Sequence, residues 1–508
     1  MRKPIREWRW ADLGRRGWAA TAFAALTLAP ALLSAQSLQK RLDRRLAAAP
    51  WDRNLWGIAV LDDRGRLRYG LNQERLFVPA SNTKILVTAT ASALLPPDWT
   101  VKTSVYANGP VVNGEVEGDL VLYGRGDPTL GRSKRCYDVD TTKAGVCDTD
   151  PFAELRELAD SLRAHGVRSV RGDLVGDGSY FEPETVHPAW EGYDLNWWYA
   201  APVTGLAFND NSVDIRWDPD TLVGAPARIS FTPDLGDLSL ENRTRTVNDS
   251  GETTIDFYRI PGTLQLWAEG DVNRQSKGHL ESFALPDPNL YAARAFRVVL
   301  AQAGISVLGT TRSTTDSLEY RAARATPPLA EASGRPLKDW IFPVLNTSQN
   351  WFAEMLLKQL GRQFGSAGSW AEGVRVERRF LIDSVGVDST QFAVVDGSGL
   401  AASDLVSPLT FVKILQYTRA HHGWATFEPG LPLAGAPGSL KNRFEGTPLA
   451  GRVRAKTGSI SRVNTISGFI EGKDGKVWTF SVMANHHAQP GRAILAQLDS
   501  LVVEIGKR

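Results

Sequence analysis

The 508-residue chain has few of the residues that bind metals or crosslink small secreted proteins. It contains two cysteines, Cys136 and Cys147, and seven histidines, four of which form the adjacent pairs His421-His422 and His486-His487. Neighbouring side chains usually point apart, and no histidine stands at a suitable distance from the cysteines for a zinc site. We therefore expect no metal and no other cofactor.

The chain also lacks a strong excess of charge of either sign. It carries 58 Lys and Arg against 56 Asp and Glu, and 43% of its residues are hydrophobic, which is typical of a soluble globular protein. Residues 1–35 hold six of the basic and two of the acidic residues, so 52 basic and 54 acidic residues remain without them. This near-neutral balance argues against nucleic acid as the partner.

A long membrane-spanning run is missing as well, although the N-terminus is apolar in part. Six Lys and Arg fall within 1–16, an apolar run extends from Trp18 to Leu33, and the small residues Ser34 and Ala35 follow. This order is typical of a secretory signal. The alternative is a retained anchor that attaches the protein to a membrane, but the run is short for a bilayer and contains Pro30.

We therefore expect a signal peptide at 1–35 and a periplasmic or otherwise extracytoplasmic protein. Export also bears on the two cysteines, which bracket a short polar stretch. In an oxidising compartment, Cys136 and Cys147 are expected to form one local disulfide.

Strand and helix patterns at both ends of the chain predict one α/β domain closed by the two termini. Strands are expected at 55–61, 67–71, 463–470 and 477–484, and helices at 37–49, 82–95 and 494–505. Between about 97 and 325 the pattern changes to short strands separated by Gly and Asp, and 221–283 is the most β-like part. Helical patterns return at 290–303 and 351–360.

Three short motifs occur in order along the chain: Ser81-Asn82-Thr83-Lys84, Ser348-Gln349-Asn350 and Lys456-Thr457-Gly458. On a helix, Lys84 would lie on the same face as Ser81, and partial burial would lower the pKa of its amine so that it could accept the serine proton. The N-terminus of that helix would also supply the Ser81 N–H to a developing oxyanion. The alternative is a helix-capping Ser81 beside a solvated lysine.

The other two motifs offer complementary groups. Ser348 and Asn350 directly precede an expected helix, which would fix both side chains toward a cleft. Lys456 and Thr457 begin an expected strand and could bind a carboxylate, while Gly458 lets a substrate approach the backbone. The N–H of Ser459 would then be the second oxyanion donor.

With these motifs the chain resembles the penicillin-recognising serine enzymes. Within that group it is similar to the D-alanyl-D-alanine carboxypeptidase/endopeptidase class, the low-molecular-mass class C penicillin-binding proteins. The segments that point to this class are Pro79–Lys84, Asn346–Asn350 with Ala353-Glu354, and Asp396–Leu400, together with the 267 positions that separate Ser81 from Ser348.

The resemblance implies an α+β fold, with a β-lactamase/transpeptidase-like catalytic domain that has an antiparallel sheet flanked by helices, plus inserted β-rich domains. We place the catalytic domain at 36–96 and 326–508, one insertion at 97–220 and 284–325, and a second, β-rich insertion at 221–283. Ser81 would be acylated, Lys84 would be its base, Ser348 would relay the proton and Asn350 would hold the substrate amide. Lys456 and Thr457 would bind the substrate carboxylate.

The implied substrates are peptidoglycan peptides, and β-lactams would be covalent inhibitors. An acidic residue of the inserted domain would recognise the amino group of the stem-peptide diamino acid, and Asp194 is the candidate, although it could equally be a surface residue. The aromatic cluster Trp190, Trp197, Trp198 and Tyr199 could stack on glycan, but such groups are more often part of a core.

Two rivals stay open. A serine β-lactamase would share the motifs, but no insertion of this size is expected in one. A noncatalytic cell-wall binding protein would keep the fold, but the complete set of motif residues argues against lost chemistry.

Overall fold

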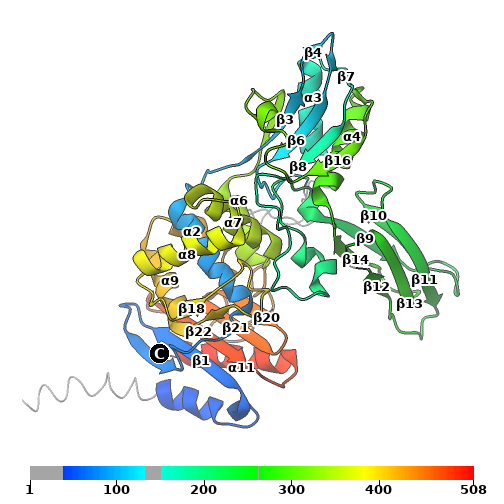
Figure 1. The fold of residues 1–508 in the computed structure, drawn as a ribbon. Helices are drawn as coiled ribbons and strands as arrows, with labels where there is room; N and C mark the ends of the chain where they lie inside the picture. The colour runs from blue at the N-terminus through cyan, green and yellow to red at the C-terminus, as the bar shows by residue number, and fades with distance from the viewer. Residues whose placement is uncertain (1–37, 132–149, 261, 508) are drawn as a thin grey trace, which may run out of the picture.

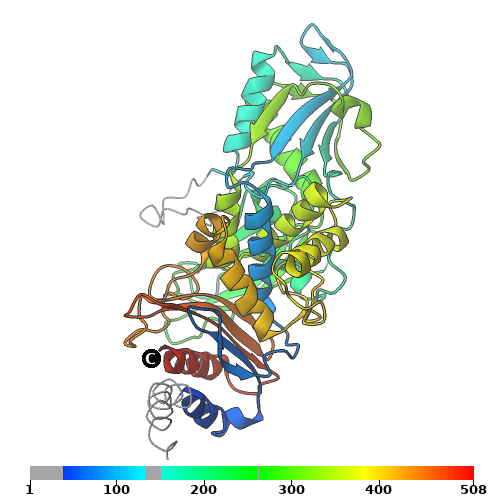
Figure 2. The same ribbon diagram turned by 90° about the vertical axis from the view of Figure 1, so that its left-hand side faces the viewer.

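The computed structural model describes residues 38–131, 150–260 and 262–507. The predicted signal peptide at 1–35 and the predicted pair Cys136 and Cys147 lie outside the described residues. The molecule is elongated, with a mixed α/β body that holds both ends of the described chain and two further units beyond it (Figures 1 and 2).

A five-stranded antiparallel sheet forms the centre of the body, in the order β2-β1-β22-β21-β20. Its strands are β1 (Leu55–Leu61), β2 (Leu67–Leu71), β20 (Val453–Ile460), β21 (Val463–Glu471) and β22 (Val477–Asn485). Because β1 pairs with β22 along its whole length, the two ends of the chain share one sheet. β20 forms one edge of the sheet.

Helices cover both faces of this sheet, as Figure 2 shows. One face is covered by a helix over 38–46 and by α11 (Gly491–Gly506). These helices pack on strand residues such as Val482, while its neighbour Met483 points to the core on the other face. This alternation is the period of two that a strand imposes. The second face carries α2 (Lys84–Leu94), α6 (Leu337–Asn346), α7 (Asn350–Phe364), α8 (Trp370–Asp383) and α9 (Pro408–Ala420).

Helix α2 runs through the middle of this second layer. All its residues from Lys84 to Ser92 are buried, which suits a sequence of Ile, Leu, Val, Ala and Thr that is apolar on every side. A short 3-10 turn, η2 (Ala80–Thr83), leads into it. The fold therefore places Lys84 inside the protein and Ser81 at the helix entrance.

The first inserted unit has a five-stranded sheet in the order β16-β8-β6-β3-β17 and a small sheet in the order β15-β7-β5-β4. Helices α3 (Ala153–Ala164) and α4 (Pro288–Gln302) pack on it. The strands are β3 (Lys102–Asn108), β4 (Val111–Val112), β5 (Glu115–Val116), β6 (Asp119–Gly124), β7 (Ser169–Val170), β8 (Leu174–Asp177), β15 (Ser306–Val307), β16 (Thr311–Thr314) and β17 (Ala330–Ser333). Since β17 pairs with β3, this unit extends past the boundary expected at 325.

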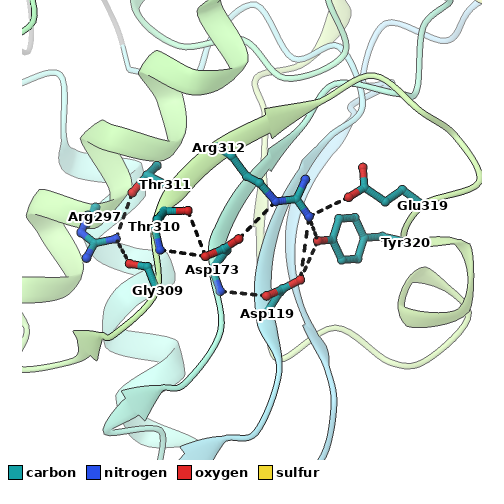
Figure 3. A network of polar contacts seen from close by, with 9 residues as sticks. All are labelled: Asp119, Asp173, Arg297, Gly309, Thr310, Thr311, Arg312, Glu319 and Tyr320. Atoms are coloured by element: carbon teal, nitrogen blue, oxygen red, sulfur yellow. Dashed lines mark hydrogen bonds and ion pairs between the residues drawn. The ribbon is translucent and has the colours of Figure 1, made fainter.

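Two look-alike segments, Gly118–Val121 and Gly172–Val175, lie side by side in this unit. They enter the parallel strands β6 and β8, in which Leu120 pairs with Leu174. Their aspartates meet at one arginine (Figure 3): Arg312 Nε lies 3.3 Å from Asp173 Oδ2, and the Asp173 N–H donates to Asp119 Oδ1 at 2.8 Å. Arg312 also pairs with Glu319 at 2.6 Å. The network fastens β16 to β8 and β6.

The second inserted unit consists of two three-stranded sheets, β10-β9-β14 and β11-β13-β12. The strands are β9 (Ser212–Asp218), β10 (Arg228–Thr232), β11 (Ser239–Val247), β12 (Asp256–Arg259), β13 (Gln265–Asn273) and β14 (His279–Ala284). The expected start at 221 was too late, because β9 begins at Ser212 and pairs with both β10 and β14. The Leu285 N–H donates to the Asn211 carbonyl at 2.9 Å and joins the two ends of the unit.

The remaining described elements are short. They are η1 (Trp51–Arg53), η4 (Asp194–Asn196), η5 (Trp198–Ala200), η6 (Asn209–Asn211), α5 (Arg321–Arg324), β18 (Phe392–Ala393), β19 (Leu405–Val406), α10 (Trp424–Phe427) and η7 (Glu428–Gly430). Within the described residues, no helix is both long and apolar enough to span a membrane.

Candidate active site

Ser81 and Lys84 meet at the entrance of α2. The Lys84 Nζ atom lies 2.9 Å from Ser81 Oγ, as the spacing of three residues predicted. Ala80 has a φ of 48°, in the left-handed region, so the chain turns sharply just before the serine. Lys84 is completely buried, whereas Ser81 is partly exposed.

The Lys84 amine has two further partners, both of them acceptors. It donates to Asn350 Oδ1 at 2.7 Å and to the Ser398 carbonyl at 2.7 Å. The orientation of the Asn350 amide is determined by its other end, since Nδ2 donates to the Tyr199 carbonyl at 3.1 Å. A neutral amine has two N–H bonds and one lone pair. With both N–H bonds directed at these two acceptors, the lone pair faces Ser81.

Burial also makes the neutral form of Lys84 accessible. Desolvation lowers the pKa of Lys84 to about 7, and the carboxyl groups of Asp396, Glu354 and Asp404 oppose this shift without reversing it. An amine with such a pKa can accept and return a proton near neutral pH.

The second and third motifs form an adjoining pair. Ser348 lies between α6 and α7 with a φ of 65°, and Lys456 Nζ donates to Ser348 Oγ at 2.9 Å and to the Thr457 carbonyl at 2.6 Å. Burial lowers the pKa of Lys456 well below its usual value, and the positive charge of Lys84 adds to this effect. The third motif lies in the middle of β20 and does not begin a strand as expected.

Gly458 joins the third motif to the first. A Cβ atom added there would lie 3.0 Å from the Ser81 nitrogen and 2.3 Å from Thr465 Oγ1, so only glycine leaves the Ser81 N–H open. Next to it, the exposed Ser459 accepts a hydrogen bond from Asn464 at its hydroxyl. The Thr457 hydroxyl donates to Ser439 Oγ at 3.1 Å.

Asp194 belongs to the inserted segment that borders this cluster. Its carboxylate accepts a hydrogen bond from the Tyr199 hydroxyl at 2.9 Å, and the Tyr199 carbonyl in turn binds Asn350. Burial raises the pKa of Asp194. Asp194 is therefore linked to the motif residues through Tyr199 rather than placed among them.

Two of the neighbouring tryptophans pack against core residues. Trp190 is 7% exposed, lies 5.8 Å from Trp370 between ring centres, and donates to Asp396. Trp197 is partly buried, and its ring lies 4.8 Å from that of Phe283 at a tilt of 34°. For Trp190, and in part for Trp197, the structure agrees with the core alternative.

Several groups of the site carried no signal in the sequence. The carbonyls of Ser398 and Tyr199 bind the site side chains through backbone atoms, which any residue could supply. Ser439 lies in a loop without a periodic pattern. The segment Asp396–Leu400 did stand out, but its role was not apparent without the positions of Lys84 and Glu354.

Comparisons with known proteins assign the chain to a family. The family described as "D-Ala-D-Ala carboxypeptidase 3 (S13) family" matches residues 38–505. The chain belongs to this family of peptidases. The family is one of D-Ala-D-Ala carboxypeptidases, so the family resemblance found in the sequence is confirmed.

Among the relatives of known sequence, the D-alanyl-D-alanine carboxypeptidase of Actinomadura sp. (strain R39) is 29% identical over 97% of this chain and 92% of its own length. The D-alanyl-D-alanine carboxypeptidase DacB of Haemophilus influenzae is 23% identical over 86% of this chain and 87% of its own length. The crystal structure of penicillin binding protein 4 from Haemophilus influenzae superposes with a TM-score of 0.76 and 22% identity, over 92% of this chain and 99% of that one. The predicted α+β fold with inserted units is thereby confirmed.

Proposed function

We propose that the protein is an exported serine D,D-peptidase that cleaves D-alanyl-D-alanine ends and crosslinks of peptidoglycan through an acyl-enzyme on Ser81. The observation that carries this proposal is the Lys84 amine, buried and 2.9 Å from the Ser81 hydroxyl. Membership of a D-Ala-D-Ala carboxypeptidase family supports the substrate class.

In the first step, neutral Lys84 takes the Ser81 proton while Oγ attacks the carbonyl of the penultimate D-alanine. The oxyanion would accept hydrogen bonds from the N–H groups of Ser81 and Ser459; the Ser81 nitrogen lies beside Gly458, the residue that precedes Ser459. Such a donor contributes about 100-fold or more to the rate.

The tetrahedral intermediate then expels the amine of the terminal residue, which must gain a proton. We assign this transfer to Ser348, whose hydroxyl bonds to the Lys456 amine and belongs to the same motif as the Lys84 partner Asn350. Ser348 gives its hydroxyl proton to the leaving amine and takes up the proton that Lys84 removed from Ser81, so Lys84 is neutral again. Water then attacks the acyl carbonyl while Lys84 takes a proton from it, and Lys84 returns that proton to Ser81 Oγ as the acyl bond breaks.

The substrate would lie along β20, an edge strand of the sheet, and pair with its backbone beyond Ala455, since residues 432–434 already bond to Val453 and Ala455. Its terminal carboxylate would be held by the hydroxyls of Thr457 and Ser439, beside the amine of Lys456. Gly458 permits the close approach. Asp194 would bind the amino group of the diamino acid, supported by its link to Asn350 through Tyr199.

Carboxypeptidase and endopeptidase action would share this acyl-enzyme and differ in the amine that leaves. β-Lactams would acylate Ser81 and remain bound, and a complex of the Haemophilus influenzae penicillin binding protein 4 with a β-lactam has been solved. A serine β-lactamase is disfavoured by the two inserted units, and a noncatalytic wall-binding protein by the complete set of site contacts.

The test is labelling of the purified protein with a fluorescent penicillin, with Ser81→Ala as the control. We expect one stable label on the wild type and none on the variant. Digestion of crosslinked and uncrosslinked muropeptides then assigns the activity, because free D-alanine reports carboxypeptidase and released monomer reports endopeptidase action. Absence of label and of both products would refute the proposal, and rapid penicillin turnover would favour the β-lactamase.

Export and the disulfide belong to the same proposal. A signal peptide at 1–35 and a bond between Cys136 and Cys147 would be expected of a protein that works outside the cytoplasm. Mass spectrometry of the protein isolated from its host decides both. We expect a mature chain that begins at Gln36 and is two hydrogens lighter than the same chain with both cysteines reduced. An intact N-terminus would favour the retained anchor.

A further inference from the structure

Two buried carboxylates lie next to the site without a role in the steps above. Glu354 and Asp396 are both completely buried. Glu354 follows Asn350 by one turn of α7, so the two side chains lie on the same face of the helix. Asp396 begins the segment Asp396–Ala401, which we call the carboxylate-bound loop.

The two carboxylates bind the backbone of this loop. Glu354 Oε1 accepts from the Ser398 N–H at 2.7 Å and Oε2 from the Gly397 N–H at 2.9 Å. Asp396 accepts from the N–H groups of Gly399 at 2.7 Å and Ala401 at 2.8 Å. Four hydrogen bonds of this length fix the path of the loop.

Indole groups complete both sites. Trp370 of α8 donates to Glu354 Oε2 at 2.8 Å, and Trp190 of the inserted segment donates to Asp396 Oδ2 at 3.0 Å. A Cβ atom on Gly399 would lie 2.0 Å from the Ala80 carbonyl, so the loop rests directly against the turn that carries Ser81.

The loop delivers one group to the reaction, the Ser398 carbonyl at 2.7 Å from Lys84 Nζ. This carbonyl and Asn350 Oδ1 are the two acceptors that leave the lone pair of neutral Lys84 facing Ser81. If the carbonyl turned away, the amine could rotate and direct an N–H bond at the serine, and proton transfer would stop.

We propose that Glu354 is a positioning residue of the acylation step, which holds the Ser398 carbonyl on Lys84 and thereby aims the lysine lone pair at Ser81. The inference rests on the proposed function of Ser81 and Lys84. It gives a role to the segment Asp396–Leu400, which the three motifs leave unexplained.

The test compares Glu354→Gln with Glu377→Gln. A glutamine can accept at one atom only, so one loop N–H loses its partner. Glu377 of α8 is an equally buried acid near Glu354, but neither of its carboxyl oxygens has a hydrogen-bond partner among the described residues. It is a control for loss of a buried acid that interacts electrostatically with Asp396 and Glu354 but makes no hydrogen bond to the loop.

The measurement is penicillin acylation of the full-length variants by stopped flow. For Glu354→Gln we expect the rate constant at saturating penicillin to fall about 100-fold, with the penicillin dissociation constant within about twofold of wild type. For Glu377→Gln we expect less than a threefold loss, about the scatter of a residue outside the site. A purely structural role of Glu354 would lower the fraction of protein that takes label and leave the rate constant of the remainder unchanged.

Equal losses in the two variants, or a wild-type rate constant in Glu354→Gln, would overturn the inference. If Glu354→Gln does not fold, Trp370→Phe replaces it, because it removes the indole donor of Glu354. It also shrinks the ring that packs on Trp190 and lies 3.8 Å from Lys358 Nζ, so the fraction of protein that takes label is measured beside the rate constant. A fall in the rate constant of about fivefold is expected, and no fall overturns the inference. Wild-type protein that takes no label at all would instead refute the proposed function, so the two failures are distinguishable.

Discussion

At the scale of single residues, the proposed chemistry depends on the protonation state of one lysine. A spacing of three residues is enough to bring Lys84 to Ser81, but a solvated lysine there would stay charged and could not accept a proton. Full burial in α2 removes the water that stabilises the charged form. The carboxylates nearby act in the opposite direction, so the pKa remains near 7 rather than far lower.

The rate of acylation should therefore depend on pH with the midpoint that Lys84 sets. Because the pKa of Lys84 is lowered to about 7, the amine is protonated below that pH and neutral above it. We expect the rate of penicillin acylation to rise about tenfold per pH unit below the midpoint and to level off above it. Stopped-flow measurement of penicillin acylation at pH values below and above 7 tests this dependence. The Lys84→Arg variant should show no plateau. A wild-type rate independent of pH would contradict the assignment of Lys84 as base.

Gly458 is predicted to keep the proposed oxyanion site open. An alanine there would bring a Cβ atom to 3.0 Å from the Ser81 nitrogen and crowd the site of the oxyanion. We expect Gly458→Ala to slow acylation about 100-fold, the usual effect of losing one oxyanion donor. Gly491→Ala is the control, since a Cβ atom at Gly491 would meet nothing within 4 Å. A variant of Gly458 that folds and reacts at the wild-type rate would exclude this assignment of the oxyanion site.

At the scale of elements, the sequence determined most of the body and less of the insertions. Strands β1 and β2 were predicted with the bounds that the structure has, because β1 is a continuous apolar run, β2 alternates between apolar and polar residues, and a turn separates them. The strand β17 was missed, since Ala330–Ser333 is short and becomes a strand only by pairing with β3. The start of the second insertion was placed too late for a related reason, because β9 joins that unit by pairing with β10 and β14.

For the site, too, the sequence predicts some groups and not others. The motif side chains could be found from residue type and spacing, and the three motifs do lie together. The acceptors that orient Lys84 could not be found in full, because the Ser398 carbonyl is a backbone atom placed by a loop that two distant carboxylates bind. Local patterns carry no information on contacts of this kind.

The network around Arg312 makes a prediction about element stability. Arg312 bonds to groups from the starts of β6 and β8, and its guanidinium lies 5.6 Å from the Tyr320 ring centre (Figure 3). Because these side chains are partly exposed, we expect Arg312→Ala to cost only about 1–2 kcal/mol of local stability. Amide hydrogen exchange should quicken in β6, β8 and β16 but not in the central sheet. The control is Arg243→Ala, which removes an exposed ion pair with Glu241 and should leave exchange unchanged in all these strands; equal effects of the two variants would show that the network does not fasten β16.

At the scale of the whole molecule, the insertions take part in the site rather than standing apart from it. The segment 190–199 binds Asn350 through the Tyr199 carbonyl and Asp396 through the Trp190 indole. That segment is held from its other side by the second inserted unit. Arg259 of β12 is 6% exposed and donates to the Leu195 carbonyl at 2.9 Å and to Asn196 Oδ1 at 3.2 Å. A chain of direct contacts thus leads from the β-rich unit to the Lys84 partner.

Replacement of Arg259 by methionine tests whether this support matters for the substrate. Methionine fills much of the volume but leaves the Leu195 carbonyl without its donor, so the segment that carries Asp194 and Tyr199 should loosen. We expect kcat/KM for a stem peptide with a free amino group to fall about tenfold, and penicillin acylation, which needs no contact with Asp194, to change by less than about threefold. Arg245→Ala, which removes an exposed ion pair with Asp271 in the same unit, should change neither. Equal loss of both reactions in Arg259→Met would mean that the unit supports the fold of the site as a whole. Loss of neither reaction would mean that the contacts at Leu195 and Asn196 have no part in substrate recognition.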